Sequence, residues 1–157
     1  MQTAPELLID QFCPEDQPAF AALNRWWLIE YGIHEAADEV QLVDPVGEII
    51  APGGQIYVAR RGAEVLGTCA VVPHEEGVME IAKLVVVPAA QGAGLGRRLM
   101  EACFAYARAR GARRLILVSN SRLSAALKLY ENLGFRRGPV PPDTPYATAD
   151  VYMELDL

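Results

Sequence analysis

Three glycines stand at alternate positions in residues 91–97, the segment QGAGLGR near the middle of the chain. An apolar run over residues 78–87 precedes the segment and apolar residues at helical spacing follow it, so we expect a turn between a strand and a helix. A helix start offers unpaired backbone N–H groups at the positive end of its dipole, and glycines let an anion approach the main chain closely. The expected ligand is a phosphate or pyrophosphate group.

Other glycine-rich phosphate sites fit this segment less well. A P-loop continues with Gly-Lys-Ser/Thr, and residues 91–97 have neither the lysine nor the hydroxyl that Mg-nucleotide chemistry requires. A dinucleotide site has G-x-G-x-x-G spacing on a first βαβ unit, whereas this segment follows three or four predicted strands. The simplest alternative is a turn that only packs a helix against a sheet.

The elements that must position this turn alternate along the chain. Apolar periodicity and turn residues predict strands at residues 7–12, 55–60, 65–72, 78–87, 115–118 and 148–155, with a further strand opening at Phe135. The same criteria predict helices at residues 15–30, 35–43, 95–110 and 123–133. This order predicts one α/β domain over residues 1–157, built around a single mixed sheet.

Composition limits the classes of partner. The 157 residues are 52% hydrophobic and 22% charged, as in globular proteins with a buried core. The net charge of -6 argues against a nucleic-acid binder, which needs a broad basic face. No apolar run approaches the roughly 18 residues of a membrane span, and the N-terminus lacks signal-peptide features. We expect a cytoplasmic protein without nucleic-acid or membrane partners.

The three cysteines, Cys13, Cys69 and Cys103, do not suggest a metal or disulfide framework. They are far apart and odd in number, and none belongs to a C-x-x-C pair. Cys69 and Cys103 stand among apolar residues, where a thiol behaves as a small hydrophobic side chain. No metal is expected.

Several motifs together resemble the GNAT superfamily of N-acetyltransferases. The Q-x-x-G-x-G pattern of residues 91–96 resembles the pyrophosphate loop of that family. The V-x-P of residues 86–88 and the glutamate Glu80 also resemble features of the family. The segment LYENLGF at residues 129–135 is similar to the family's "LYEKLGF". A glycine-rich packing turn would not explain this last match. The resemblance covers about the last two-thirds of the chain, from Gln55 onward.

The resemblance implies the GNAT fold, a single mixed central β-sheet flanked by about four α-helices. It also implies that acetyl-CoA is the co-substrate and that a primary amine of a small molecule or peptide is acetylated directly, in a ternary complex. The residues implied in cofactor binding are Leu84, Val85, Val86, Gln91, Gly92, Ala93, Gly94, Leu95, Gly96, Arg97 and Asn120.

These cofactor residues fall into three groups. The backbone of residues 84–86 would pair with the amide-rich pantetheine arm as a short extra strand does, and residues 91–97 would hold the pyrophosphate. Asn120 would bond the pantetheine arm; the alternative is a helix-capping role for Asn120 or Ser121. A backbone N–H near Val85 is expected to polarise the thioester carbonyl.

Tyr130 is the predicted general acid. The resemblance places its hydroxyl beside the CoA sulfur, and a tyrosine, with an ordinary pKa near ~10, is protonated at neutral pH. It would therefore protonate the departing thiolate. The alternative is a core tyrosine on a helix face, with Leu127, Leu129 and Leu133 as neighbours.

Glu80 is the predicted general base. It interrupts an apolar strand, and its position matches a glutamate that many GNAT enzymes use to take the amine's proton, often through water. The alternatives are an ion pair with Lys83 and a solvent-facing side chain.

Other side chains are weaker candidates for the acceptor site. His34 and His74 are expected in exposed loops, although the segment around His34 often borders the acceptor pocket in this family. Trp26 and Trp27 are about 100° apart on a helix, so at most one faces the core; the other lines the acceptor site or covers the sheet. Tyr146 and Asp150, after a proline-rich loop, are expected to close the acceptor pocket.

Two other functions are alternatives to acetylation of a small molecule or peptide. A non-catalytic acyl-CoA sensor or regulatory module would keep the binding loop without acetyl transfer. A toxin that acetylates charged tRNA would favour a basic surface, which the acidic composition opposes. The sequence distinguishes neither the amine acceptor nor a monomer from a homodimer.

Overall fold

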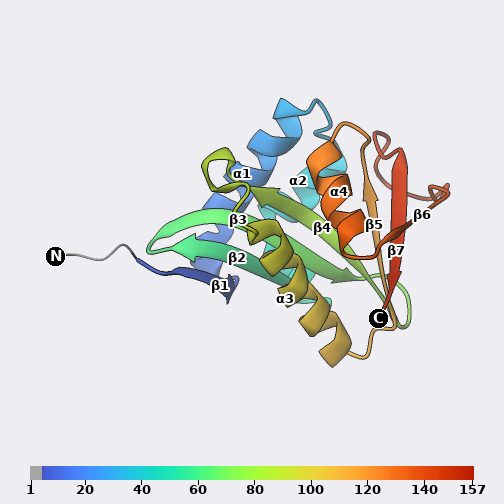
Figure 1. Ribbon diagram of the computed structural model, residues 1–157, viewed down its shortest axis with the longest axis horizontal. Coiled ribbons are helices and arrows are strands. Elements are labelled where there is room, and N and C mark those ends of the chain that lie inside the picture. The colour runs from blue at the N-terminus through green and yellow to red at the C-terminus, as the bar shows by residue number, and fades with distance from the viewer. Residues whose placement is uncertain (1–4) are drawn as a thin grey trace.

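The computed structural model describes residues 5–157, in which seven strands form a single twisted sheet (Figure 1). The strand order is β1-β2-β3-β4-β5-β7-β6. The strands are β1 (Leu7–Gln11), β2 (Gln55–Arg61), β3 (Glu64–Pro73), β4 (Val78–Val86), β5 (Arg114–Ser119), β6 (Arg136–Gly138) and β7 (Val151–Asp156). Within these residues β4 and β5 pair in parallel and every other neighbouring pair is antiparallel, so the sheet is mixed as predicted.

Helices cover both faces of the sheet (Figure 1). The four α-helices of residues 5–157 are α1 (Gln17–Glu30), α2 (Ala36–Val43), α3 (Leu95–Ala109) and α4 (Ser124–Asn132). Three shorter turns are η1 (Pro14–Asp16), η2 (Val46–Ile50) and η3 (Pro88–Ala90). The observed elements agree with the predicted order, and the predicted number of α-helices is confirmed.

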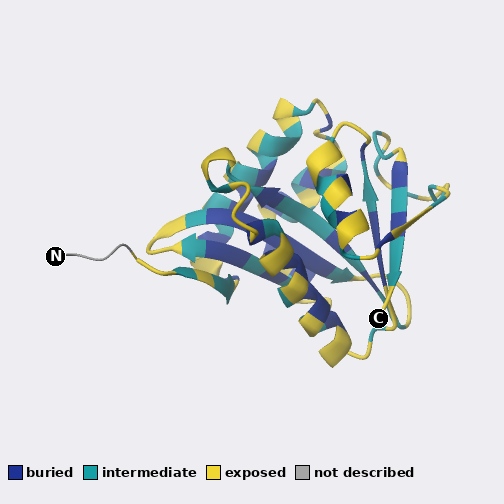
Figure 2. Cartoon of the chain, viewed as in Figure 1, coloured by how far each residue is buried: buried dark blue, intermediate teal, exposed yellow. Residues whose placement is uncertain are grey.

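Alternation along the strands divides the core into two clusters. Figure 2 shows buried residues, in dark blue, on the central strands. Cys69 and Val71 of β3 belong to the cluster that contains the buried residues of α3 and α4. Ala70, between them, belongs to the cluster that contains Phe20 of α1 and Leu42 of α2. Successive strand side chains point to opposite faces, so each face of β3 packs against a different helix pair.

One local prediction was wrong, and one short turn was not predicted. The last strand was expected from residue 148, but β7 begins at Val151 because residues 146–150 form a loop held by side chains of other elements. The η2 turn was not expected after Asp44. The Asp44 carboxylate accepts a hydrogen bond from the Gly47 backbone N–H at 3.0 Å, so the C-cap residue of α2 also holds the next turn.

The centre of the sheet is split where β4 and β5 diverge. The two strands pair only from Val78 to Glu80 of β4. Further along β4, Thr68 of β3 pairs with Val85 and Ala70 pairs with Ala82, so a bulge at Lys83 and Leu84 bends the strand. Beyond Glu80, the β4 edge therefore has no strand partner among the described residues.

Buried hydrogen bonds hold this bulge. Lys83 has a φ of 55°, a left-handed conformation that costs free energy for a residue with a side chain. Its carbonyl accepts a hydrogen bond from the Thr68 hydroxyl at 2.8 Å, and Thr68 in turn accepts one from the Asn24 carboxamide at 3.0 Å. Asn24 and Thr68 are both buried. A polar contact from α1 through β3 thus fixes the shape of β4.

Candidate active site

The glycine-rich segment forms the predicted turn at the start of α3. Gly94 is the N-cap of the helix with a φ of 79°, and Gly92 has a φ of 85°. The first intrahelical hydrogen bond runs from the Arg98 N–H to the Gly94 carbonyl. The backbone N–H groups of the first turn therefore have no intrahelical partner and lie at the positive end of the helix dipole. This local geometry suits an anion.

One groove gathers nearly all of the predicted cofactor residues. Every one of them except Ala93 and Asn120 lines a groove between β4, the start of α3 and α4. Leu129 of α4 forms part of the opposite wall. A Cβ atom on Gly96 would come within 3.0 Å of the Leu129 side chain, so this glycine lets α3 approach α4 closely. The groove thus depends on glycines for both its conformation and its packing.

The side chain of Gln91 closes the turn before α3. Its carboxamide donates a hydrogen bond to the Val86 carbonyl at 3.0 Å. This contact links the end of β4 to the glycine-rich segment. Binding of a pyrophosphate by residues 91–97 stays a prediction, in which Gln91 would shape the turn while backbone groups face the anion.

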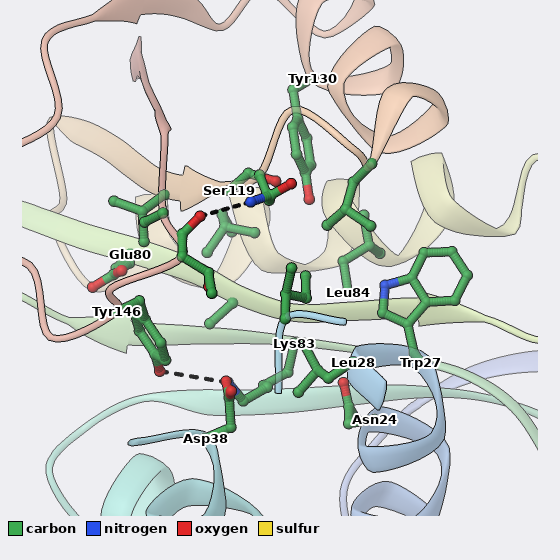
Figure 3. Close-up of a pocket in the computed structure, with 18 residues that line it drawn as sticks. Asn24, Trp27, Leu28, Asp38, Glu80, Lys83, Leu84, Ser119, Tyr130 and Tyr146 are labelled. Carbon is green, nitrogen blue, oxygen red and sulfur yellow. Dashed lines mark hydrogen bonds and ion pairs between the residues drawn. The ribbon is translucent and has the colours of Figure 1, made fainter. Parts of the chain in front are cut away.

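A second pocket opens between the diverging strands β4 and β5 (Figure 3). Its lining comes from α1, the loop after α1, α2, β4, β5, the turn after β5, α4 and the loop before β7. Trp27 and Leu84 line both the groove and this pocket, so the two are continuous at these residues. Glu80 and Tyr130, the two predicted catalytic residues, both line the pocket. The fold therefore brings them together beside the end of the cofactor groove.

Tyr130 combines a buried ring with a hydroxyl that faces the pocket. The residue is 7% exposed, and its ring packs edge-on against Phe135 with centroids 6.0 Å apart. The hydroxyl points from α4 into the cavity (Figure 3). Burial raises the pKa of this hydroxyl well above its usual value, which keeps the proton in place. The ring of Tyr130 thus belongs to the core, while its hydroxyl faces the pocket.

Glu80 lines the same pocket from β4. Burial raises the pKa of its carboxyl, and this effect is opposed by the charges of His74 and Lys83. The nearest ring nitrogen of His74 is 3.8 Å from the carboxylate. The predicted alternative of an ion pair with Lys83 is wrong, because Lys83 binds Asp38 instead. The alternative of a solvent-facing side chain is also wrong, since Glu80 lines the pocket and is only 26% exposed.

Asn120 has partners within the protein. Its carboxamide nitrogen donates to the Thr148 carbonyl at 2.7 Å, and its oxygen accepts from the Arg122 N–H at 2.9 Å. The expected capping role for Asn120 or Ser121 is wrong, because the N-cap of α4 is Leu123. Asn120 instead ties the turn after β5 to the loop before β7. A contact with pantetheine stays a prediction.

Sequence reasoning missed the most buried ion pair of the pocket. Lys83 Nζ lies 2.7 Å from an Asp38 carboxylate oxygen, and both side chains are less than 7% exposed. The signal was present in part, because Lys83 is the second charged residue in the apolar segment that contains Glu80. Asp38 comes from α2 and carries no comparable signal.

The loop before β7 completes the pocket. Tyr146 lines it as predicted, with its hydroxyl 3.5 Å from Lys83 Nζ. Asp150 was also expected to close the pocket, but it is exposed and binds Ser121 instead. Glu35 accepts hydrogen bonds from the Ala147 and Thr148 backbones, which lower the pKa of its carboxyl together with the Thr148 hydroxyl. The loop is thus held over the pocket from the start of α2.

Of the remaining candidate residues for the acceptor site, one lines the pocket and the others are exposed. Trp27 lines the pocket, whereas Trp26 is 41% exposed. His34 and His74 are exposed as predicted, and His34 bonds Glu39 outside the pocket lining. Among residues 5–157 no cluster of three metal-ligating side chains occurs. No helix in the same residues has the length and apolar character needed to cross a bilayer.

Comparisons with known proteins agree with this geometry. Residues 8–135 match the Acetyltransferase (GNAT) family. The chain is 32% identical over 130 residues to the uncharacterized N-acetyltransferase YjgM of Escherichia coli K12, an alignment that covers 77% of each protein. This chain belongs to the GNAT acetyltransferase family. The resemblance seen in the sequence is confirmed.

Solved structures show the same fold in other GNAT proteins. A GNAT acetyltransferase of Staphylococcus aureus superposes with a TM-score of 0.89 at 16% identity, over 97% of this chain and 99% of that one. The PaiA N-acetyltransferase of Thermoplasma acidophilum, crystallised with coenzyme A, superposes with a TM-score of 0.77, also at 16% identity and with the same coverage. The mixed sheet of this GNAT protein is therefore the family's sheet.

Proposed function

We propose that this GNAT protein is an acetyl-CoA-dependent N-acetyltransferase. In this proposal the acetyl group passes directly to a primary amine of a small molecule or peptide, within a ternary complex. One observation carries the proposal: the groove at the start of α3 and the pocket that contains Glu80 and Tyr130 are continuous at Trp27 and Leu84. A donor in the groove and an acceptor in the pocket would therefore meet beside the β4 bulge.

The groove has the chemical features that coenzyme A requires. The first turn of α3 presents free N–H groups for a pyrophosphate. Beyond Glu80 the β4 edge that faces β5 has no strand partner in the described residues, so its backbone is available to the amides of pantetheine. Leu129 and neighbouring alanines of α4 supply an apolar wall. Acetyl-CoA would supply the activated acetyl thioester.

Two side chains would move the protons of the reaction. Glu80 would take a proton from the amine, because its raised pKa makes its carboxylate a stronger base than an exposed glutamate. Tyr130 would donate its proton to the departing thiolate sulfur, since its hydroxyl stays protonated and faces the pocket. A backbone N–H near Val85, where β4 is bent, would stabilise the charge that develops on the carbonyl oxygen.

A thiol-release assay with acetyl-CoA and a panel of primary amines tests the proposal. We expect amine-dependent release of free thiol, together with an acetylated amine detected by mass spectrometry. Cys13 is an exposed free thiol, so the blank must contain the protein without amine. Tight binding of acetyl-CoA without release for any amine would instead favour a non-catalytic sensor.

A further inference from the structure

The charges inside the acceptor pocket are not independent of one another. Three charged side chains line it, Asp38, Glu80 and Lys83. Asp38 and Lys83 lie 2.7 Å apart, with side chains 4% and 6% exposed. Water does not screen such a pair, so each charge is compensated by the other and by its immediate neighbours.

Further contacts hold the pair in this arrangement. The second carboxylate oxygen of Asp38 accepts a hydrogen bond from the Glu35 backbone N–H at 2.9 Å. Lys83 Nζ also lies 3.5 Å from the Tyr146 hydroxyl and 5.2 Å from the centre of its ring. The pair is therefore positioned from α2, β4 and the loop before β7 together.

Among the described residues that line the pocket, Glu80 is then the one charged side chain without an ion-pair partner in the lining. His74, 3.8 Å from Glu80, is 48% exposed and lies outside the lining. The Glu35 carboxylate also lies outside it and is occupied by the loop before β7. Apolar side chains make up much of the remaining wall, among them Trp27, Leu28, Ile33 and Leu123.

We propose that this pocket selects acceptors that bring one ammonium group and no second charge, namely primary monoamines with a neutral, largely apolar body. This inference rests on the proposed acetyltransferase function and names the substrate class of the same site. The ammonium of such an acceptor matches the single carboxylate of Glu80, and its body meets the apolar wall.

Both kinds of additional charge would be disfavoured for electrostatic reasons. The carboxylate of a free amino acid would enter a pocket that already contains Glu80 and Asp38. The second ammonium of a short diamine would find Asp38 already bound to Lys83. In a short acceptor the second charge is only a few bonds from the reacting amine, so it would lie near these side chains. A charge without a partner in such a desolvated site costs binding free energy.

Matched acceptor pairs test this selection on the wild-type protein. L-phenylalaninol and L-phenylalanine differ by an alcohol in place of a carboxylate, and butylamine and 1,4-diaminobutane differ by a second ammonium. At about pH 8.5, above the range in which histidines are generally charged, we expect kcat/KM to favour the first of each pair by about 10-fold or more. Equal or reversed preference in both pairs would overturn the inference.

Variants of the Asp38–Lys83 ion pair test whether this pair causes the selection among acceptors. Asp38→Asn retains an acceptor for the Glu35 N–H but leaves Lys83 uncompensated, so the preference should shift about 10-fold toward L-phenylalanine. Lys83→Met leaves Asp38 uncompensated and should shift the preference about 10-fold toward 1,4-diaminobutane. A folded single variant that keeps the wild-type ratios would contradict the inference.

The double variant Asp38→Asn/Lys83→Met is the matched control. It removes both charges and leaves Glu80 as it was, so the wild-type preference should return even if the rate is lower. A double variant that shows the preference of either single variant would mean that hydrogen bonding, not charge balance, sets selectivity. If either single variant unfolds, which a thermal melt reports, the other one and the double variant decide.

The outcomes separate this inference from the function on which it rests. Thiol release with amino acids or diamines as the best acceptors would retain the acetyltransferase and overturn the acceptor class. Absence of thiol release with every amine would overturn the proposed function itself.

Discussion

The groove at the start of α3 and the pocket between β4 and β5 meet at Trp27 and Leu84, yet they are built in different ways. The groove offers mainly backbone groups, from the β4 edge and from the first turn of α3, and residues 84–97 provide most of them. The pocket offers side chains that come from eight parts of the chain, from Asn24 to Ala149. Its ion pair joins residues 45 positions apart.

This difference shows how each region can change. A backbone site requires glycines and a strand edge, so a few substitutions can abolish it and few can alter its ligand. A side-chain site can change its charge or volume one residue at a time while the sheet stays the same. We therefore expect a single substitution either to abolish donor binding or to leave it unchanged. Single substitutions in the pocket should instead alter the preference among acceptors in small steps.

The largest expected effect is at Gly94. Gly94→Val should abolish detectable binding of coenzyme A in calorimetry, because a branched side chain at a φ of 79° distorts the turn and covers its N–H groups. Gly111→Val is the matched control, since Gly111 also has a positive φ, 81°, and open space around its Cβ position at the other end of α3. The control should bind coenzyme A as wild type does. If a folded Gly94→Val protein binds coenzyme A with unchanged affinity, the groove is not the coenzyme A site.

The next largest effect concerns Tyr130. Tyr130→Phe retains the ring packing against Phe135 but lacks the proton donor, so kcat should fall by about 10- to 1,000-fold, in the lower half of that range. Acetyl-CoA affinity should change little, because the lost interaction acts in the transition state. Tyr57→Phe, outside both sites, is the control. If the Phe variant turns over like wild type, the proton comes from water or another group. If the variant is unfolded, the role of Tyr130 is to stabilise the core.

A smaller, pH-dependent effect is expected at Glu80. Glu80→Gln should lower kcat/KM by about 10-fold near pH 6, where most of the amine is protonated and a base is needed, and by much less near pH 9. Glu154→Gln is a suitable control, because Glu154 is also on a strand and its side chain is 27% exposed against 26% for Glu80. A pH–rate profile that coincides with wild type from pH 6 to 9 would leave Glu80 a structural residue.

The smallest effect is on stability at the same residue. Burial raises the pKa of Glu80 in the folded state, so the folded protein binds this proton more tightly than the unfolded chain. The stability contributed by the protonated group is present at low pH and is lost as the pH rises through the folded-state pKa. Glu80→Gln should therefore raise the Tm at pH 7 by about 1 to 3 °C and give little gain near pH 4. A lower Tm at pH 7 would show that the ionised carboxylate stabilises the fold.

Sequence periodicity was sufficient to predict the order of the elements. Strands with alternating apolar residues and helices with a repeating apolar face carry a local signal, because each side chain's direction follows from its position in the element. The glycines of residues 91–97 carried a second local signal, since the positive φ angles at Gly92 and Gly94 favour glycine. The family, the groove and the candidate roles of Glu80 and Tyr130 followed from such short segments.

Tertiary structure alone decided what surrounds those residues. Lys83 could bind Glu80, three positions away, or any distant carboxylate, and the bulge in β4 together with the position of α2 placed it against Asp38. Glu35 could equally have faced solvent, but the loop before β7 brought two backbone N–H groups to it. Long polar side chains reach several partners at similar cost, so their choice depends on where the backbone places those partners. The sequence by itself therefore determined the sheet and the glycine-rich groove, and only the folded chain determined the charge of the proposed acceptor pocket.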